Sequence, residues 1–129
     1  MRCSFTCKGH SNIRATHPTT IEFTKDSELT PKGDCILGVS ADFDYKALKE
    51  MLTQKKAIVD LQIGKEKDSL ICVPNKAFAS TSEVVLRKSS FMSERTFATH
   101  ASKGSQDINR KLIKLLKSKE AVLHVTIHD

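Results

Sequence analysis

The chain has 129 residues, of which 39% are hydrophobic and 28% are charged. This length suits one compact domain, and the composition is typical of a folded protein rather than a disordered one. The formal net charge of +6 favours a negatively charged partner such as RNA, DNA or an anionic surface.

No apolar run approaches the roughly 20 residues of a membrane-spanning helix. The first ten residues, MRCSFTCKGH, also lack the apolar stretch of a secretory signal. We therefore expect a cytoplasmic protein with no membrane partner. Its cysteines should then be reduced thiols, with Cys35 and Cys72 in the core because they lie within apolar runs.

The first half of the chain predicts the element order strand, strand, strand, helix, strand. Apolar residues at i, i+3 and i+4 spacing predict a helix near residues 45–55, with Asp42 or Asp44 as its N-cap. The strands are expected near residues 4–9, 19–24, 35–40 and 57–63.

The second half predicts the same order. A helix is expected near residues 106–118, with Ser105 as its cap. The strands are expected near residues 69–73, 83–88, 96–99 and 121–127.

This shared pattern, at an offset of about 64 residues, indicates an internal duplication. Residues 57–63 (AIVDLQI) align with residues 121–127 (AVLHVTI). We predict one α+β domain over residues 1–129 with pseudo-repeats at about 1–64 and 65–129. Each repeat would be a β-β-β-α-β unit, and the two helices would pack on a mostly antiparallel sheet or partial barrel.

The segment from Gly9 to Asp42 carries more hydrogen-bonding groups than a plain core hairpin needs, which indicates a polar partner. Its richest part, residues 10–17 (HSNIRATH), holds two histidines, an asparagine and an arginine. Three interpretations remain open for this loop: contact with exposed bases and phosphates of RNA, a catalytic or metal site, or a structured loop whose side chains bond their own backbone.

The catalytic interpretation makes His17 a general base that Glu22, Asp34 or Asp42 would orient. The metal interpretation pairs His10 with His17 and one of the same carboxylates.

A zinc site is a further alternative. Cys3 and Cys7 share a strand face and could act with one of the two histidines, but their spacing differs from the C-x-x-C knuckle of structural zinc sites. We therefore expect no cofactor.

The helix expected in the second half carries only Asp107 against its lysines and arginine. A solvated helix face and a phosphate-binding face explain this imbalance equally well. The chain has no Trp and one Tyr, so recognition of shape and phosphate is favoured over base stacking. The residues expected to contact RNA are His10, Asn12, Arg14, His17, Lys25, Lys32, Arg87, Lys88, Arg95, Lys103, Arg110, Lys111, Lys114 and Lys117.

The blocks GHSNIRATHPTTIEFTKDSELTPKGDCILGVSAD and SERTFATHASKGSQDINRKLIKLLKS resemble an archaeal and eukaryotic family catalogued as domain of unknown function 371. The resemblance spans nearly the whole chain and implies no catalytic residue. The chain is also similar to the first type of microsporidian ribosome dormancy factor. That similarity implies a factor that occupies the tRNA exit (E) site of idle ribosomes.

Together these observations favour a monomeric dormancy (hibernation) factor. It would bind rRNA and ribosomal proteins, inhibit translation by occupancy and have no small-molecule substrate. A small metal- or histidine-dependent enzyme is the alternative function. A homodimeric scaffold that pairs through an exposed sheet edge is a third.

Overall fold

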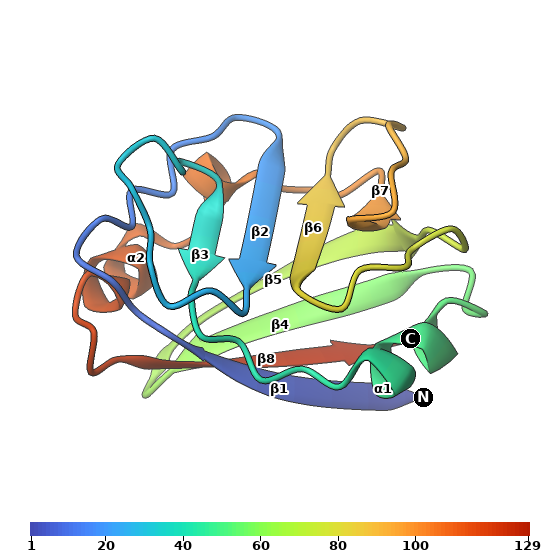
Figure 1. Ribbon diagram of the computed structural model, residues 1–129, viewed down its shortest axis with the longest axis horizontal. Coiled ribbons are helices and arrows are strands. Elements are labelled where there is room, and N and C mark those ends of the chain that lie inside the picture. The colour runs from blue at the N-terminus through green and yellow to red at the C-terminus, as the bar shows by residue number, and fades with distance from the viewer.

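The computed structural model describes residues 1–129 as one eight-stranded sheet with two α-helices (Figure 1). The strands are β1 (Arg2–Lys8), β2 (Thr20–Thr24), β3 (Ile36–Gly38), β4 (Ala57–Ile63), β5 (Glu66–Pro74), β6 (Glu83–Arg87), β7 (Thr96–Thr99) and β8 (Val122–His128). The helices are α1 (Tyr45–Met51), the short 3-10 helix η1 (Ser105–Asp107) and α2 (Arg110–Leu116). All eight predicted strands are present, and the α+β class is confirmed.

The strands follow the order β1-β8-β4-β5-β7-β6-β2-β3. Neighbours are antiparallel except for the parallel pairs β2–β3 and β6–β7. The two ends of this order meet at one bridge, where Lys8 and Val39 exchange backbone hydrogen bonds of 2.7 and 2.9 Å. Figure 1 shows the long strands β1, β8, β4 and β5 running below the short strands β3, β2 and β6.

The core lies on the concave side of this bent sheet. Strands β1, β4, β5 and β8 alternate more buried and less buried residues, whereas β2 and β7 are buried along their whole length. In β1, Phe5 and Cys7 are buried whereas Ser4 and Lys8 are exposed. The Phe5 ring packs edge-on against Phe23, with ring centroids 5.5 Å apart. Cys72 is in the core as predicted. The same prediction was wrong for Cys35, which is only half-buried.

β5 begins three residues before its predicted start because β4 continues directly into it through a tight turn. Ile63 pairs with Glu66 across the turn residues Gly64 and Lys65. Gly64 has a φ of 57°, a conformation that glycine adopts without steric cost.

Asp44, one of the two residues predicted as the N-cap of α1, caps this helix. The Asp44 carboxylate accepts a hydrogen bond of 3.3 Å from the backbone N–H of Lys46. The helix ends at Met51, four residues before the predicted end, since the chain must turn to enter β4 at Ala57.

The prediction of the second helix was wrong at its start. η1 and an extended Ile108 occupy the start of the predicted range, and Asn109 rather than Ser105 caps α2 by accepting from the Lys111 N–H at 3.0 Å.

Neither α-helix has the length and apolar character needed to cross a bilayer.

The two halves repeat a local geometry after β3 and β7. Ser40 and His100 both have positive φ, of 50° and 53°. Three pairs of amide-to-carbonyl hydrogen bonds correspond: Ser40 to Asp26 and His100 to Ser89, Ala41 to Thr24 and Ala101 to Arg87, Asp42 to Thr6 and Ser102 to Ile71.

Candidate functional site

Residues 9–19, which we call the histidine loop, join β1 to β2 and begin against the end of α2 (Figure 1). The His10 N–H donates to the Leu116 carbonyl at 2.9 Å. A Cβ atom at Gly9 would lie only 2.1 Å from the Ser118 carbonyl oxygen, so no larger residue fits at this position without moving the backbone. Glycine therefore permits the loop to dock on the helix.

Two cations of α2 and its C-terminal end hold the middle of the histidine loop. The Arg110 guanidinium donates to the carbonyls of Ala15 at 2.9 Å and Arg14 at 3.1 Å. The Lys117 ammonium donates to the Ile13 carbonyl at 2.8 Å. Both residues were predicted as phosphate contacts, but in the folded chain each already binds loop carbonyls.

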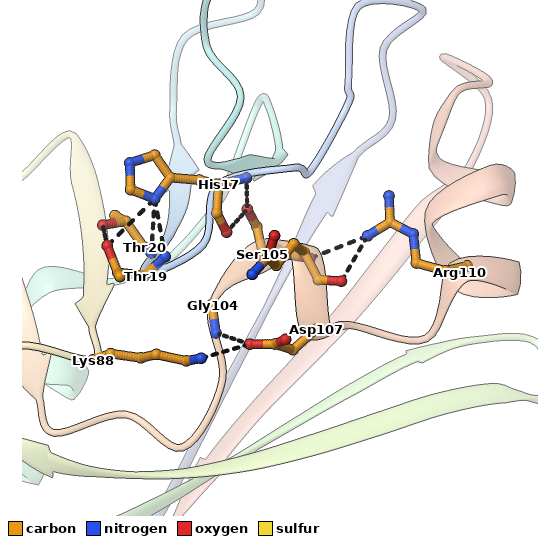
Figure 2. A network of polar contacts seen from close by, with 9 residues as sticks. His17, Thr19, Thr20, Lys88, Gly104, Ser105, Asp107 and Arg110 are labelled. Carbon is orange, nitrogen blue, oxygen red and sulfur yellow. Dashed lines mark hydrogen bonds and ion pairs between the residues drawn. The ribbon is translucent and has the colours of Figure 1, made fainter.

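Ser105 fixes the far end of the loop from within the fold (Figure 2). Its fully buried hydroxyl accepts from the His17 N–H at 3.0 Å and lies 3.2 Å from the carbonyl oxygens of His17 and Asp34. The Gln106 N–H donates to the same His17 carbonyl at 3.1 Å. Ser105 therefore joins the loop to η1, which explains why it is not the cap of α2.

Both imidazoles bond the backbone of their own loop. Nδ1 of His17 accepts from the N–H groups of Thr19 and Thr20, each at 3.1 Å, and Nδ1 of His10 accepts from the Asn12 N–H at 3.0 Å. These bonds assign the proton of each neutral ring to Nε2. A ring in this state has no free nitrogen to accept a proton as a general base.

The side chain of Asn12 is also used locally, because its amide donates to the Leu29 carbonyl at 2.7 Å. The structured-loop interpretation therefore accounts for both histidines and the asparagine.

None of the carboxylates of the catalytic interpretation forms a hydrogen bond or ion pair with either histidine side chain. Asp42 accepts from the N–H and the hydroxyl of Thr6, both at 2.7 Å. Glu22 lies 3.6 Å from a nitrogen of Arg95, and Asp34 meets the histidine loop through its backbone carbonyl.

The fold does not bring together the side chains that the metal and zinc interpretations require. No group of three or more His, Cys, Asp or Glu side chains is placed to hold a metal ion. Burial raises the pKa of Cys3 to about 11 and raises the pKa of Cys7 further, which disfavours the thiolates that zinc requires.

The predicted cations outside α2 are mostly engaged within the chain. Three of them form ion pairs: Lys88 with Asp107, Arg95 with Glu22 and Glu83, and Lys103 with Asp68. Arg87 donates to Thr96, Lys25 lies over the Phe43 ring, and Lys32 is exposed.

The remaining cations gather around α2, where two hollows open. One, of about 620 Å³, lies beside the end of the helix and is lined by Lys8, His10, Lys117 and Lys119, among others. The other, of about 460 Å³, lies between α2 and the β4–β5 turn. We call this region the α2 basic surface and define it as Lys8, Lys65, Arg110, Lys111, Lys114, Lys117 and Lys119. The Arg14 side chain, a predicted RNA contact, instead lies 3.5 Å from the Pro31 carbonyl.

The same hollows are also lined by three glutamates, Glu28, Glu66 and Glu120. The surface therefore carries charges of both signs, with more cations than anions. Sequence reasoning missed Lys8, Lys65 and Lys119 as members of this surface. The position of Lys8 directly before Gly9 and His10 was a usable signal, whereas Lys65 reaches α2 only through the fold.

Comparison with known proteins decides the family. The family model described as Domain of unknown function (DUF371) matches residues 5–129. The chain belongs to the DUF371 family. It is 37% identical over 128 residues to an uncharacterized protein of Methanocaldococcus jannaschii, an alignment that covers 93% of this chain and 95% of that protein. The predicted resemblance to domain of unknown function 371 is therefore confirmed.

Proposed function

We propose that this protein binds ribosomal RNA through the α2 basic surface and acts as a dormancy factor. It would block the tRNA exit (E) site by occupancy. The similarity to the microsporidian dormancy factor supports the ribosome as target and the E site as location. The net charge of +6 and the cations around α2 support a polyanion as the partner.

The observation that carries the proposal is the contrast between two sets of cations. Lys88, Arg95 and Lys103 are already neutralised by carboxylates of the chain. Lys8, Lys111, Lys114 and Lys119 are exposed on the α2 basic surface and form no ion pair. An unpaired lysine can exchange its counterions for a phosphate of the nucleic acid. A lysine or arginine in an ion pair must first break that pair.

The state of the histidine loop supports binding rather than turnover. Its two imidazoles and Asn12 are used to hold the loop's own backbone. We infer a loop that presents a fixed shape to its partner, with the Nε2–H of His17 available as a hydrogen-bond donor. The enzyme alternative has no specific observation in its favour.

We also infer that the two halves descend from a duplicated β-β-β-α-β unit. The corresponding hydrogen bonds after β3 and β7, and the similar positive φ values of 50° at Ser40 and 53° at His100, support this origin. The protein would act as a cytoplasmic monomer in which only the second unit supplies the basic helix.

Co-sedimentation with purified ribosomes across a salt series tests the proposal. We expect binding at low salt that weakens steeply as salt rises, because each phosphate contact releases counterions. Replacing Lys8, Lys114 and Lys119 together with alanine should reduce the slope of log K against log[salt] by about 2 units, since each lost phosphate contact contributes about 0.7–0.9.

A matched control removes the same charge from the opposite end of the molecule, through Lys46, Lys55 and Lys56, which are also exposed. This control variant should keep the slope of the wild-type protein. Wild-type protein that stays in the supernatant at low salt, or equal slopes for the two triple variants, would contradict the proposal.

A further inference from the structure

The β6–β7 loop carries the two most exposed large hydrophobic side chains of the chain. Phe91 and Met92 are each 59% exposed. They lie in the middle of residues 88–95, a part of the loop that we call its tip. Figure 1 places this loop beyond the ends of β6 and β7 and away from α2. Exposed apolar side chains are common when single, but an adjacent Phe–Met pair at a loop tip indicates a contact.

The tip is held in place by bonds on both sides. The His100 N–H donates to the Ser89 carbonyl at 3.1 Å, and the Asn75 amide donates to the Ser93 carbonyl at 3.2 Å. The Phe91 N–H also bonds the Ser89 hydroxyl at 3.3 Å. A partner would therefore meet a largely preformed tip, which lowers the ordering cost of binding.

Arg87 completes the arrangement. Its guanidinium carbon lies 4.9 Å from the centroid of the Phe91 ring, and its Nε donates to the Thr96 hydroxyl at 2.9 Å. That bond fixes the guanidinium, which lies over the aromatic ring. An aromatic ring with a neighbouring arginine is the pair of groups that proteins use to stack unpaired bases and contact their phosphates.

We propose that Phe91 stacks on an unpaired nucleobase of the bound RNA, with Met92 against the base edge and Arg87 directed at the adjoining phosphate. This inference rests on the proposed RNA binding and adds a second contact to it. The size of the tip favours a base over a protein partner, since two side chains among serines offer far less than the roughly 800 Å² per partner of a stable protein interface.

The absence of tryptophan from the chain allows a direct test. In a Phe91→Trp variant the only indole lies at the tip, and stacking on a base should quench its emission. The probes are a short single-stranded RNA of mixed sequence, a duplex of the same length, and the same single strand made with abasic ribose units. An Ile71→Trp variant is the matched control, because Ile71 is a half-exposed apolar residue of β5.

We expect single-stranded RNA to quench the Phe91→Trp variant, and expect little quenching by the duplex or the abasic strand or in the Ile71→Trp control. Phe91→Ala should weaken binding of the single strand roughly tenfold, the scale of one lost base stack, with no change for the abasic strand. The triple replacement of Lys8, Lys114 and Lys119 should lower affinity for all three probes but leave the quenching at saturation unchanged.

Salt-dependent RNA binding without quenching at position 91 would overturn this inference and leave the proposed function standing. Loss of ribosome binding by Phe91→Ala, with naked RNA binding unaffected and no quenching, would assign the tip to a ribosomal protein and also overturn it. A wild-type protein that binds neither RNA nor ribosomes would overturn both proposals.

Discussion

Replacing Glu22 with glutamine should remove a pH dependence from the stability of this protein. Glu22 lies on β2 and is only 8% exposed. Burial raises its pKa to about 7 from an ordinary value of 4.5, the neighbouring charge of Glu83 adds to the effect, and Arg95 at 3.6 Å partly opposes it. Between these two pKa values the folded protein holds a proton that the unfolded chain has released.

The sign follows from that difference in bound protons. The stabilisation from the raised pKa is fully present below pH 4.5 and is lost as pH rises through 7. A shift from 4.5 to about 7 corresponds to at most about 3 kcal/mol in the free energy of unfolding. Glutamine does not titrate, so the Glu22→Gln variant should match wild type near pH 5 and become relatively more stable by pH 8.

Urea unfolding at pH values from 5 to 8 measures this effect as a difference between wild type and variant. Glu94→Gln is the control, because Glu94 is exposed and its side chain forms no ion pair, so its loss should leave the pH profile unchanged. Parallel profiles for wild type and Glu22→Gln would refute the assignment of a proton to buried Glu22 near neutral pH.

Three further substitutions test the contacts that build the site, each by urea unfolding at pH 7. Ser105→Ala should lower the free energy of unfolding by about 1–3 kcal/mol, because the backbone N–H and carbonyl of His17 lose their hydrogen bonds to the Ser105 hydroxyl. An unchanged free energy of unfolding would show that Ser105 does not hold the histidine loop. Gly9→Ala should lower the free energy of unfolding more than Ser105→Ala does, because its Cβ would lie 2.1 Å from the Ser118 carbonyl oxygen. An unchanged free energy of unfolding would contradict the close approach of Gly9 to the Ser118 backbone. Asp44→Ala should cost about 1 kcal/mol whereas Asp44→Asn should cost little, and equal losses would argue against capping by the side chain.

The sequence was sufficient for the features that depend on local pattern. The spacing of Leu48 and Met51 predicted α1, the alternation in residues 57–63 predicted β4, and Asp44 was one of two predicted caps. Ser105 illustrates what local pattern cannot provide. By residue type it is a good cap for the following helix, but its hydroxyl bonds His17, 88 positions earlier in the chain.

The cations of the site were predicted as a set, but their roles were not. Arg110 and Lys114 belong to the same helix and have the same formal charge. Arg110 is engaged by the carbonyls of Arg14 and Ala15, more than 90 positions away, whereas Lys114 lines a hollow. Which cation is engaged depends on which loop packs against the helix, and that contact appears only in the folded chain.

The loop after β5 and the histidine loop are held by different contacts, and this difference indicates where a binding function can be tested. After β5, the Asn75 side chain accepts from the Ala77 N–H at 3.1 Å and donates to the Thr96 carbonyl of β7 at 2.8 Å. The histidine loop is held by two cations, Arg110 and Lys117, from α2 and its C-terminal end.

Those two cations therefore have a structural contact as well as a place on the α2 basic surface, and replacing them would lower stability together with any affinity. Lys8, Lys114 and Lys119 lie on the same surface without an internal ion pair. A loss of binding in variants of these three lysines, at unchanged free energy of unfolding, is then attributable to the missing charge rather than to a displaced loop.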